Sequence, residues 1–363
     1  GCLIIDEGIR VIPENGFLCR EDFEAIRFPE GVEKIGREAF RGCGHLKCVD
    51  LPASLKTLGK EAFGYCSCLQ DIRFPDGLEE IPEDCCKSCE KLKRVKFGAG
   101  LKTIGEDAFY YCKNLETIEF PTSLKKIEKR AFAYCNSLRS VKILDNIEVI
   151  ETETFQGCES LATVETDGLH FAPFEKDVFL DTPYLSEARK RNPLVVIDDC
   201  LVDGRTAKGD VVLPEGLVQI CNSAFLNCTE ITSVMIPDTV KLISPSAFEG
   251  CTSLKKVSIP QGQMYVLDHI FYDCVSLEEV KLPPLGDVWV GEQPFGNTPW
   301  QRAKEVDNQP LVIGEYISDG TFCKGSVRIS GAKHIAEAAF KDNYDVTEVV
   351  IEDGVESIER HAF

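Results

Sequence analysis

Cysteine has the widest chemical range of any residue type in this sequence, and the chain contains 18 of them. Thiols can form disulfides, ligate zinc or carry redox reactions. Cys86 and Cys89 form a C-x-x-C motif, and Cys66 and Cys68 form a C-x-C motif. A structural zinc site needs four ligands at compatible spacing, and neither cluster supplies them. We therefore predict no metal site, no redox centre and no cofactor.

Nine cysteines share one place in a repeating unit, three residues after an aromatic residue or after Cys86, which replaces it. They are Cys43, Cys66, Cys89, Cys112, Cys135, Cys158, Cys228, Cys251 and Cys274. A position used so often is a packing position, where free cysteine behaves as a small apolar residue. Neighbouring copies would stand ~4.8 Å apart with parallel Cβ vectors, whereas a disulfide needs converging Cβ atoms about 3.8 Å apart. We predict that these thiols are buried, unpaired and slow to react, and that Cys48 is exposed.

Histidines and catalytic motifs offer no active site. The five histidines stand at different phases of the repeat, so no His–carboxylate or His–Cys constellation is implied; they are His45, His170, His269, His334 and His361. The sequence contains no P-loop, no G-x-G-x-x-G and no H-E-x-x-H motif. We predict that the protein is not an enzyme and that it has no catalytic residues.

Composition excludes several classes of partner. The chain has 363 residues, of which 44% are hydrophobic, so it can bury a substantial core. Its formal net charge of −20 disfavours nucleic acid and anionic membranes, which bind clustered Lys and Arg. No apolar run approaches the ~18 residues of a membrane span. The first residues, GCLIIDEGIRVIP, lack the basic start and apolar stretch of a signal peptide, and the sequence leaves secretion open.

An aromatic residue recurs along the chain with a period of 23. The recurring positions are Phe17, Phe40, Phe63, Cys86 in place of an aromatic, Phe109, Phe132, Phe155, Phe179, Phe225, Phe248, Phe271, Phe295, Phe340 and Phe363. The intervals 179–225 and 295–340 each span about two periods. A fixed period of this length is typical of leucine-rich repeats. The array has room for about sixteen turns.

Each unit reads roughly A-F-x-x-C-x-x-L-x-x-V-x-[LIF]-P-x-x-[LV]-x-x-I-G-x-x. Leu46, Val49 and Leu51 alternate as in a strand with one buried face, and Pro52 ends the pairing because it lacks an N–H group. We predict a repeat solenoid, a right-handed leucine-rich-repeat coil whose 23-residue turns stack into a long parallel β-sheet. The repeat aromatics, Phe132 among them, should form its core.

Two related segments interrupt the array, TPYLSEARKRNPLVVIDDCLVDG (182–204) and TPWQRAKEVDNQPLVIGEYISDG (298–320), 116 residues apart. In each, Thr-Pro opens a short helix, at Tyr184–Arg191 and Trp300–Val306, since Thr can cap and Pro fits the first turn. A second Pro ends the helix, and the apolar residues after it predict a strand–turn–strand hairpin. Each interruption is either a decorated binding edge or a spacer that adjusts curvature.

These observations predict one continuous solenoid with five segments. They are repeats at 1–181, an interruption at 182–210, repeats at 211–297, a second interruption at 298–326 and terminal repeats at 327–363. DEGIRVI at 6–12 matches EDGVESI at 352–358, so the chain starts within a unit and ends on a repeat aromatic. Because solenoids need polar caps, we infer either a piece of a longer protein or irregular caps.

The strand positions that face away from the core vary most between copies. One outward row contains Asp50, Arg73, Lys96, Glu119 and Lys142, and the row beside it contains Cys48, Asp71 and Arg94. One interpretation is an exposed face with cross-strand ion pairs of under ~1 kcal/mol each. The other is a contact strip for a partner, in which Arg73, Arg94 and Lys96 form one basic cluster. The candidate binding residues are Asp71, Arg73, Arg94, Lys96, Glu119 and Lys142.

The unit with its Cys three residues after Ala-Phe, its Ile/Phe-Pro strand end and the TPW…PLVI…DG interruption resembles the BspA-like leucine-rich repeat family over nearly the whole chain. This resemblance implies a leucine-rich repeat fold without catalytic residues. Family members are surface or secreted proteins, mostly bacterial, and some bind host extracellular proteins or act in adhesion and coaggregation. The chain departs from the family pattern at Cys86, where the aromatic is missing.

The function hypothesis is a non-enzymatic protein-binding scaffold, a fragment of a bacterial adhesin-like surface or secreted protein. The resemblance implies an extracellular or cell-surface location, although a cytoplasmic one stays open. The partner would be a host extracellular-matrix protein or another cell-surface protein. One alternative is a carbohydrate-binding surface protein, which would need clustered exposed aromatics such as Trp289 and Trp300. The other is a structural spacer within a larger protein.

Overall fold

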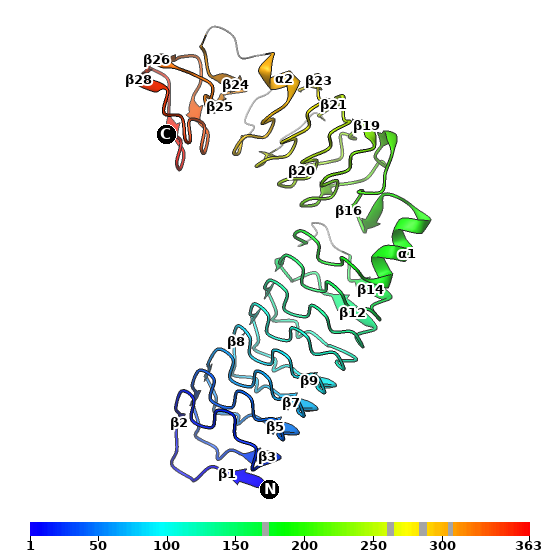
Figure 1. Cartoon of the computed structure of the whole chain (residues 1–363), viewed down its shortest axis with the longest axis vertical. Coiled ribbons are helices and arrows are strands. Elements are labelled where there is room, and N and C mark those ends of the chain that lie inside the picture. Colours follow the sequence, from blue (N-terminus) through cyan, green and yellow to red (C-terminus); the bar gives the residue numbers. More distant parts are fainter. Residues whose placement is uncertain (169–173, 260–264, 283–288, 304–307) are drawn as a thin grey trace. The chain divides into compact units, whose positions relative to one another are not determined.

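The computed structural model describes residues 1–168, 174–259, 265–282, 289–303 and 308–363. The chain forms two compact units, which meet in sequence at residues 191 and 192. Each unit is a solenoid, in which successive coils of the chain stack and their short strands pair in parallel (Figure 1). The repeat fold predicted from the 23-residue period is therefore confirmed, and short helices occur only at the two interruptions of the described chain.

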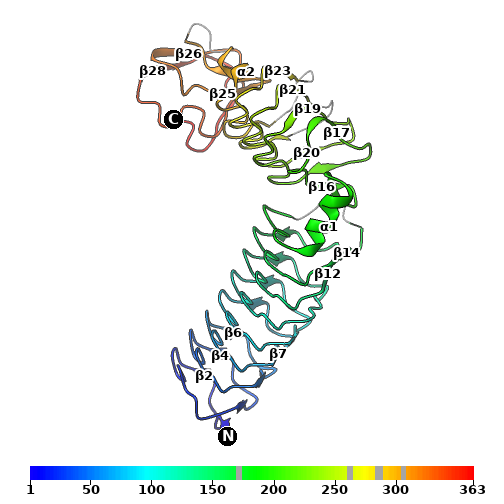
Figure 2. The ribbon, with the colours of Figure 1, turned by 45° about the vertical axis from the view of Figure 1, so that its right-hand side comes forward.

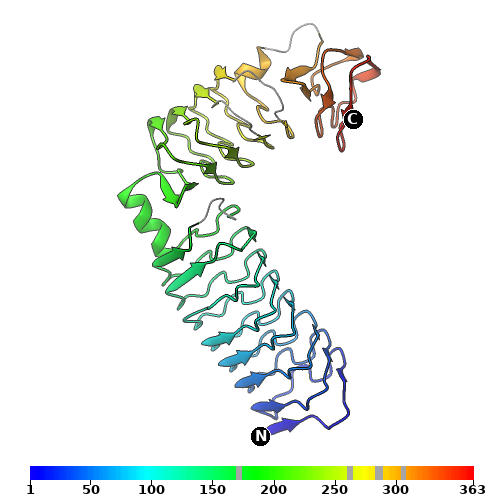
Figure 3. The same cartoon turned by 180° about the vertical axis from the view of Figure 1, so that it is seen from behind.

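The first unit is built on a five-stranded parallel sheet. Its strands are β1 (Cys2–Ile4), β3 (Ala25–Arg27), β5 (Cys48–Asp50), β7 (Asp71–Arg73) and β9 (Arg94–Lys96). Cys48 pairs with Asp71 and Asp71 with Arg94, so the register advances by one repeat per strand. A single bridge from Arg94 to Thr117 continues the column, and β12 (Ser140–Ile143) and β14 (Thr163–Thr166) resume it. Figure 3 shows these arrows from behind.

A second column of two-residue strands runs along another side of the first unit. Its members are β2 (Val11–Ile12), β4 (Lys34–Ile35), β6 (Thr57–Leu58), β8 (Glu80–Ile81), β10 (Thr103–Ile104), β11 (Lys126–Ile127) and β13 (Val149–Ile150). Figure 2 shows β2, β4 and β6 stacked on one side of this unit, with β7, β12 and β14 on the other. The isoleucine or leucine that ends each of these strands is buried, which follows from its place in the repeat.

The turns around the aromatic residues form a third hydrogen-bonded column. The N–H of Phe40 donates to the carbonyl of Ala62 at 2.8 Å, and the N–H of Glu38 donates to that of Lys60 at 2.9 Å. Residues two before the aromatic adopt positive φ, for example 52° at Glu38 and 54° at Glu61. A side chain in this region costs roughly 1–2 kcal/mol. The bonds between turns hold the conformation, so each turn depends on its neighbours.

The repeat phenylalanines form a stacked spine inside each unit. Ring centroids are 5.1 Å apart for Phe17 and Phe40 and 5.2 Å apart for Phe109 and Phe132. Phe132 is fully buried, as the sequence predicts. Cys86 leaves a gap in the spine, and there Phe74 from a strand end meets Phe109 edge-on at 6.3 Å.

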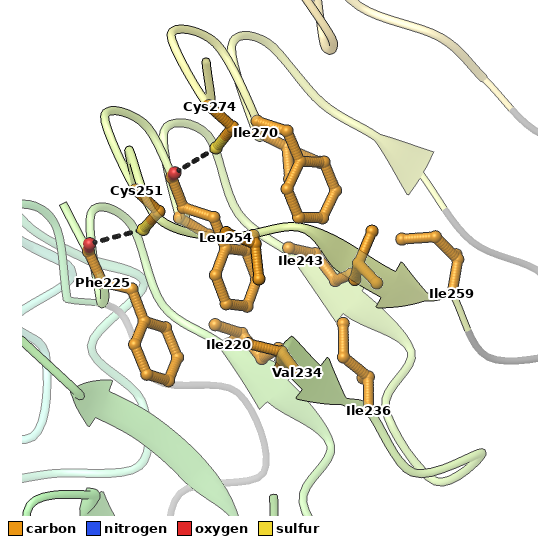
Figure 4. Close-up of a cluster of buried hydrophobic side chains, with 14 of the residues drawn as sticks. Ile220, Phe225, Val234, Ile236, Ile243, Cys251, Leu254, Ile259, Ile270 and Cys274 are labelled. Atoms are coloured by element: carbon orange, nitrogen blue, oxygen red, sulfur yellow. Dashed lines mark hydrogen bonds between the residues drawn. The ribbon is translucent and has the colours of Figure 1, made fainter. Parts of the chain in front are cut away.

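All nine predicted ladder cysteines are buried and unpaired, and Cys48 is exposed, as expected. Each buried thiol also donates to a backbone carbonyl. Cys66 Sγ lies 3.2 Å from the Phe40 oxygen, and Cys251 Sγ lies 3.2 Å from the Phe225 oxygen (Figure 4). The acceptor is 26 residues earlier in both cases. At these nine positions the thiol therefore acts both as a small apolar group and as a weak hydrogen-bond donor.

The second unit repeats this architecture around a core of the same residue types (Figure 4). One parallel sheet contains β17 (Gly209–Val212), β19 (Ile231–Met235), β21 (Lys256–Ser258) and β23 (Glu279–Lys281). The short-strand column contains β18 (Gln219–Ile220), β20 (Leu242–Ile243) and β22 (Tyr265–Val266). The last turns contribute β26 (Gly325–Ile329), β27 (His334–Ile335), β28 (Val346–Ile351) and β29 (Ser357–Ile358).

Both interruptions contain the predicted helix and hairpin. The helices are α1 (Pro183–Arg191) and α2 (Pro299–Arg302), and the hairpins pair β15 (Val195–Ile197) with β16 (Cys200–Asp203) and β24 (Leu311–Ile313) with β25 (Tyr316–Asp319). Thr182 and Thr298 cap the helices by accepting from N–H groups three residues on, at 3.2 and 3.1 Å. Residues 304–307 of the second predicted helix lie outside the described residues.

Each hairpin opens the short-strand column of the turns that follow it. The second hairpin strand of the first interruption, β16, pairs in parallel with β18, and β25 pairs in parallel with β27. The helix that precedes the second hairpin, α2, bonds to the last turn of the preceding repeats, since the Trp300 N–H donates to the Leu277 carbonyl at 2.8 Å. Within the described residues, no helix is long and apolar enough to cross a membrane.

Candidate functional site

The predicted binding residues lie on the outward face of the first parallel sheet. Asp71 and Arg73 belong to β7, and Arg94 and Lys96 belong to β9. Their buried neighbours on these strands, Ile72 among them, point into the core, so the alternation of faces is as predicted. Arg73, Arg94, Lys96, Glu119 and Lys142 are exposed, and Asp71 is half-buried.

A groove of about 950 Å³ lies on this face. Its lining brings together five of the six predicted residues, Asp71, Arg73, Arg94, Lys96 and Glu119, whereas Lys142 lies outside it. Strands β5, β7 and β9 and the segment 117–121 supply most of the wall. The volume falls in the range of about 300–1,000 Å³ that is usual for ligand sites in proteins.

One of the repeats that line the groove departs from the consensus. In several other repeats a proline stands two residues after the strand, as at Pro29, Pro52 and Pro75, but β9 is followed by Phe97 and then Gly-Ala-Gly at 98–100. A Cβ atom on Gly98 would lie 2.1 Å from the Pro75 carbonyl oxygen, and one on Gly100 would lie 2.3 Å from the Asp76 oxygen. The turn can therefore approach the preceding turn this closely only with glycine at positions 98 and 100. The apolar end of the groove lies beside this turn and is lined by Phe97, Ala99, Phe120 and Pro121, and we call it the Gly98–Gly100 notch.

The floor of the notch is apolar and well supported. Phe97 stacks between Phe74 and Phe120, with ring centroids 6.3 and 6.2 Å away. The exposed Ala99 is held by a hydrogen bond from its N–H to the Asp76 carboxylate at 2.9 Å. The sequence reasoning did not single out residues 98–100. The loss of the repeat proline at Gly98 is the signal that could have identified them.

The charges of the groove are unequally paired. Arg94 donates from Nε to the Asp71 carboxylate, and this hydrogen bond raises the pKa of Arg94. Arg73 Nε lies 3.7 Å from Asp50, which is an ion pair but too long for a hydrogen bond. Lys96 makes no hydrogen bond or ion pair with any residue that the structure describes. Two cations of the groove thus keep donors available.

Arg73 and Lys96 stand directly opposite each other on neighbouring strands. They are the one like-charged pair in the strand registers of the described residues. Facing like charges destabilise a sheet by a few tenths of a kcal/mol or more. A protein with net charge −20 has abundant acidic residues to place there, so this pair is a local cost that an anionic partner would remove.

Two groups of aromatic residues bear on carbohydrate binding. Trp300 is only 9% exposed and packs against Phe295 with centroids 4.7 Å apart, so it belongs to the core and is not an exposed aromatic, contrary to the expectation. The half-buried rings of Tyr110 and Tyr134 lie 5.5 Å apart on the turn column of the first unit. Cations cover Tyr110, with Lys87 Nζ 5.3 Å from its centroid. Such covered rings offer little stacking surface for a sugar.

Other clusters of reactive side chains are structural. Asp84 and Asp107 are buried acids, but Lys87 Nζ lies within 2.8 and 2.9 Å of their carboxylates. Within the residues described, no group of three or more His, Cys, Asp or Glu side chains could hold a metal ion. Burial raises the pKa of the Cys86 and Cys89 thiols well above the ordinary value, which makes this C-x-x-C pair unreactive.

The chain matches the family described as BspA type leucine rich repeat region in six copies, at residues 2–116, 79–200, 173–298 and 313–363. Because these matches cover nearly its whole length, the chain belongs to this family. The resemblance stated from the repeat motifs is thereby confirmed. The repeats of such proteins are generally protein-binding scaffolds without catalysis. A search of curated proteins found no match.

Three solved structures are similar to the chain. A leucine-rich repeat protein from Bacteroides ovatus is 21% identical over 98% of this chain and 82% of that one, with a TM-score of 0.40. A leucine rich cell surface protein from Faecalibacterium prausnitzii is 23% identical over 97% and 87%, with a TM-score of 0.44. A leucine-rich repeat protein of T. pallidum is 27% identical over 50% and 86%, with a TM-score of 0.41.

Proposed function

We propose that this chain is a non-enzymatic protein-binding scaffold from a bacterial adhesin-like protein, exposed at the cell surface or secreted. Its ligand is a protein of the host extracellular matrix or of another cell surface. The observation that carries the proposal is the groove over β5, β7 and β9, which gathers five predicted binding residues on one face of the first sheet. Membership of the BspA-type family supports the surface location.

Direct binding of the whole chain to immobilised extracellular-matrix proteins tests this proposal. We expect saturable binding to at least one matrix protein, with a dissociation constant in the micromolar range or tighter. A glycan array probed in parallel tests the carbohydrate alternative. Binding to glycans alone would replace the proposal with that alternative, and an absence of binding on both surfaces would favour the structural spacer.

The two functions also differ in their sensitivity to single residues. Changing Tyr134→Ala should leave binding to the matrix protein unchanged, because this ring packs within the turn column and lies outside the groove. A carbohydrate-binding protein that used the tyrosine cluster would lose its ligand in this variant. Measuring the variant on both surfaces therefore separates the two.

A further inference from the structure

The groove has the dimensions of a binding site for an extended peptide. Its lining begins at Ile26 in β3 and ends at Pro121, which spans five consecutive turns. Four intervals of ~4.8 Å between turns give a length of roughly 19 Å. An extended chain advances about 3.3 Å per residue, so about six residues fill this length. The groove therefore runs across the strands for the length of a hexapeptide.

The charges of the groove specify an anionic group at one place in it. Arg73 and Lys96 face each other across neighbouring strands, and Lys96 has no partner among the described residues. A carboxylate placed between them would relieve their repulsion and form charge-assisted hydrogen bonds. Lys96 is exposed, so its side chain can reach such a group without a change in the backbone.

The same lining disfavours a dense polyanion. Asp50, Asp71, Asp76 and Glu119 all line the groove, so four carboxylates stand against the three cations Arg73, Arg94 and Lys96. A sulfated glycan would bring several negative charges against these acids. A single acidic side chain, placed at Arg73 and Lys96, avoids that repulsion. The charge pattern thus favours a peptide over a sulfated sugar.

The Gly98–Gly100 notch specifies an apolar neighbour for that acid. Phe97, Ala99, Phe120 and Pro121 line it. Burial of a leucine or phenylalanine side chain contributes strongly to binding in such a recess. Lys96 and Phe97 both line this part of the groove. The apolar subsite and the cationic subsite are therefore adjacent.

We propose that this groove binds an extended peptide segment in which an acidic side chain stands beside a large apolar one. The carboxylate lies between Arg73 and Lys96, and the apolar side chain fills the Gly98–Gly100 notch. This inference rests on the proposed protein-binding function and names the chemistry of the partner segment.

An array of immobilised hexapeptides tests the inference with the whole chain, detected through an N-terminal tag. The array varies one acidic position and one neighbouring Leu or Phe position. We expect binding only where both are present and adjacent. Lys96→Glu should weaken the best peptide at least tenfold, and Ala99→Phe should do the same by filling the notch. Lys93→Glu, an exposed lysine of the same repeat outside the groove lining, should change binding less than twofold.

The other outcomes overturn either the inference or the proposed function. It fails if no hexapeptide binds, or if Lys96→Glu and Ala99→Phe bind like the wild type. It also fails if the wild type binds heparin, Lys96→Glu abolishes this, and acidic-apolar peptides do not bind, because the occupant is then a sulfated glycan. If a matrix protein binds the wild type and Lys96→Glu equally, the groove is not its binding site, but the proposed function stands. If the acidic-apolar peptides bind but no matrix protein does, the groove is a peptide site and the proposed matrix ligand is wrong.

Discussion

Each ladder cysteine combines two properties that no other side chain of its size offers. Cys158 Sγ donates to the Phe132 carbonyl at 3.2 Å while the side chain fills an apolar space next to Leu161 in the same turn. Alanine would fill less of the space and donate nothing, and serine would bring a hydroxyl that is costlier to bury. The sequence predicted the burial from the repeated position. It could not predict the carbonyl acceptor, because that contact joins residues 26 apart across two turns.

The buried thiols make stability depend on alkaline pH. Burial raises the pKa of Cys158 to about 12, above the value of 9.0 for a free thiol. The unfolded chain therefore loses this proton first, so the stabilisation is complete below pH ~9 and is lost as the pH rises toward 12. Between pH 8 and 10 this single thiol should reduce the free energy of unfolding by about 1.4 kcal/mol.

Denaturant titrations of the wild type and Cys158→Ala at pH 8 and pH 10 measure this contribution. The alanine variant should be less stable at pH 8 but should lose about 1.4 kcal/mol less on going to pH 10. Equal losses in the two proteins would show that Cys158 ionises as readily in the folded state as in the unfolded one.

At the scale of the element, the aromatic spine ties neighbouring turns together. Phe132 stacks on Phe109 at 5.2 Å and on Phe155 at 5.7 Å, and it is fully buried. Phe132→Ala should destabilise the first unit by ~3–5 kcal/mol, the usual range for emptying a buried aromatic site. The matched control Tyr65→Ala removes a ring that is 42% exposed and should cost under about 1 kcal/mol. Similar losses in both would mean that the spine does not hold the turns together.

The Asp-Gly pair that closes each interruption has a packing role. A Cβ atom on Gly204 would lie 2.2 Å from the Phe225 ring, and one on Gly320 would lie 2.1 Å from the Phe340 ring. Gly204→Ala should therefore destabilise the second unit by about 1–3 kcal/mol through overpacking. Gly77→Ala is a suitable control because its nearest neighbour would be 3.8 Å away. A neutral Gly204→Ala in thermal or denaturant unfolding would refute the close contact.

Local signals in the sequence were sufficient to predict the elements, but they did not predict which distant strands pair. Thr-Pro at 182–183 predicted the start of α1, and LVVIDDCLV predicted the hairpin of β15 and β16. The parallel pairing of β16 with β18 was not predicted, because it depends on how turns stack. The outward rows of the candidate site followed from strand alternation. The notch did not, since its lining comes from residues of two consecutive turns.

At the scale of the molecule, stability comes from the contacts that repeat between turns, and the proposed function comes from one groove on their surface. Three hydrogen-bonded columns and one aromatic spine repeat from turn to turn, so no single turn is stable alone. The interruptions close one set of turns and begin the next, which favours a structural role for them. The groove lies on the face of the first sheet where one repeat has Gly98 in place of the repeat proline. The predicted segment boundaries, from 1–181 to 327–363, stay a prediction.

The register, which assigns every residue to the core or to the open face, is the claim on which the groove depends. Counting thiols across the whole chain with a bulky maleimide, first native and then in guanidinium, tests it most directly. Cys48 lines the groove and should label in the native protein, as should the exposed Cys2 and Cys19. The nine ladder cysteines should react only after unfolding, because burial hides them from the reagent, and burial also raises the pKa of Cys135. Fast native labelling of Cys112 or Cys135, or a mass-spectrometric link between these two, would contradict the register.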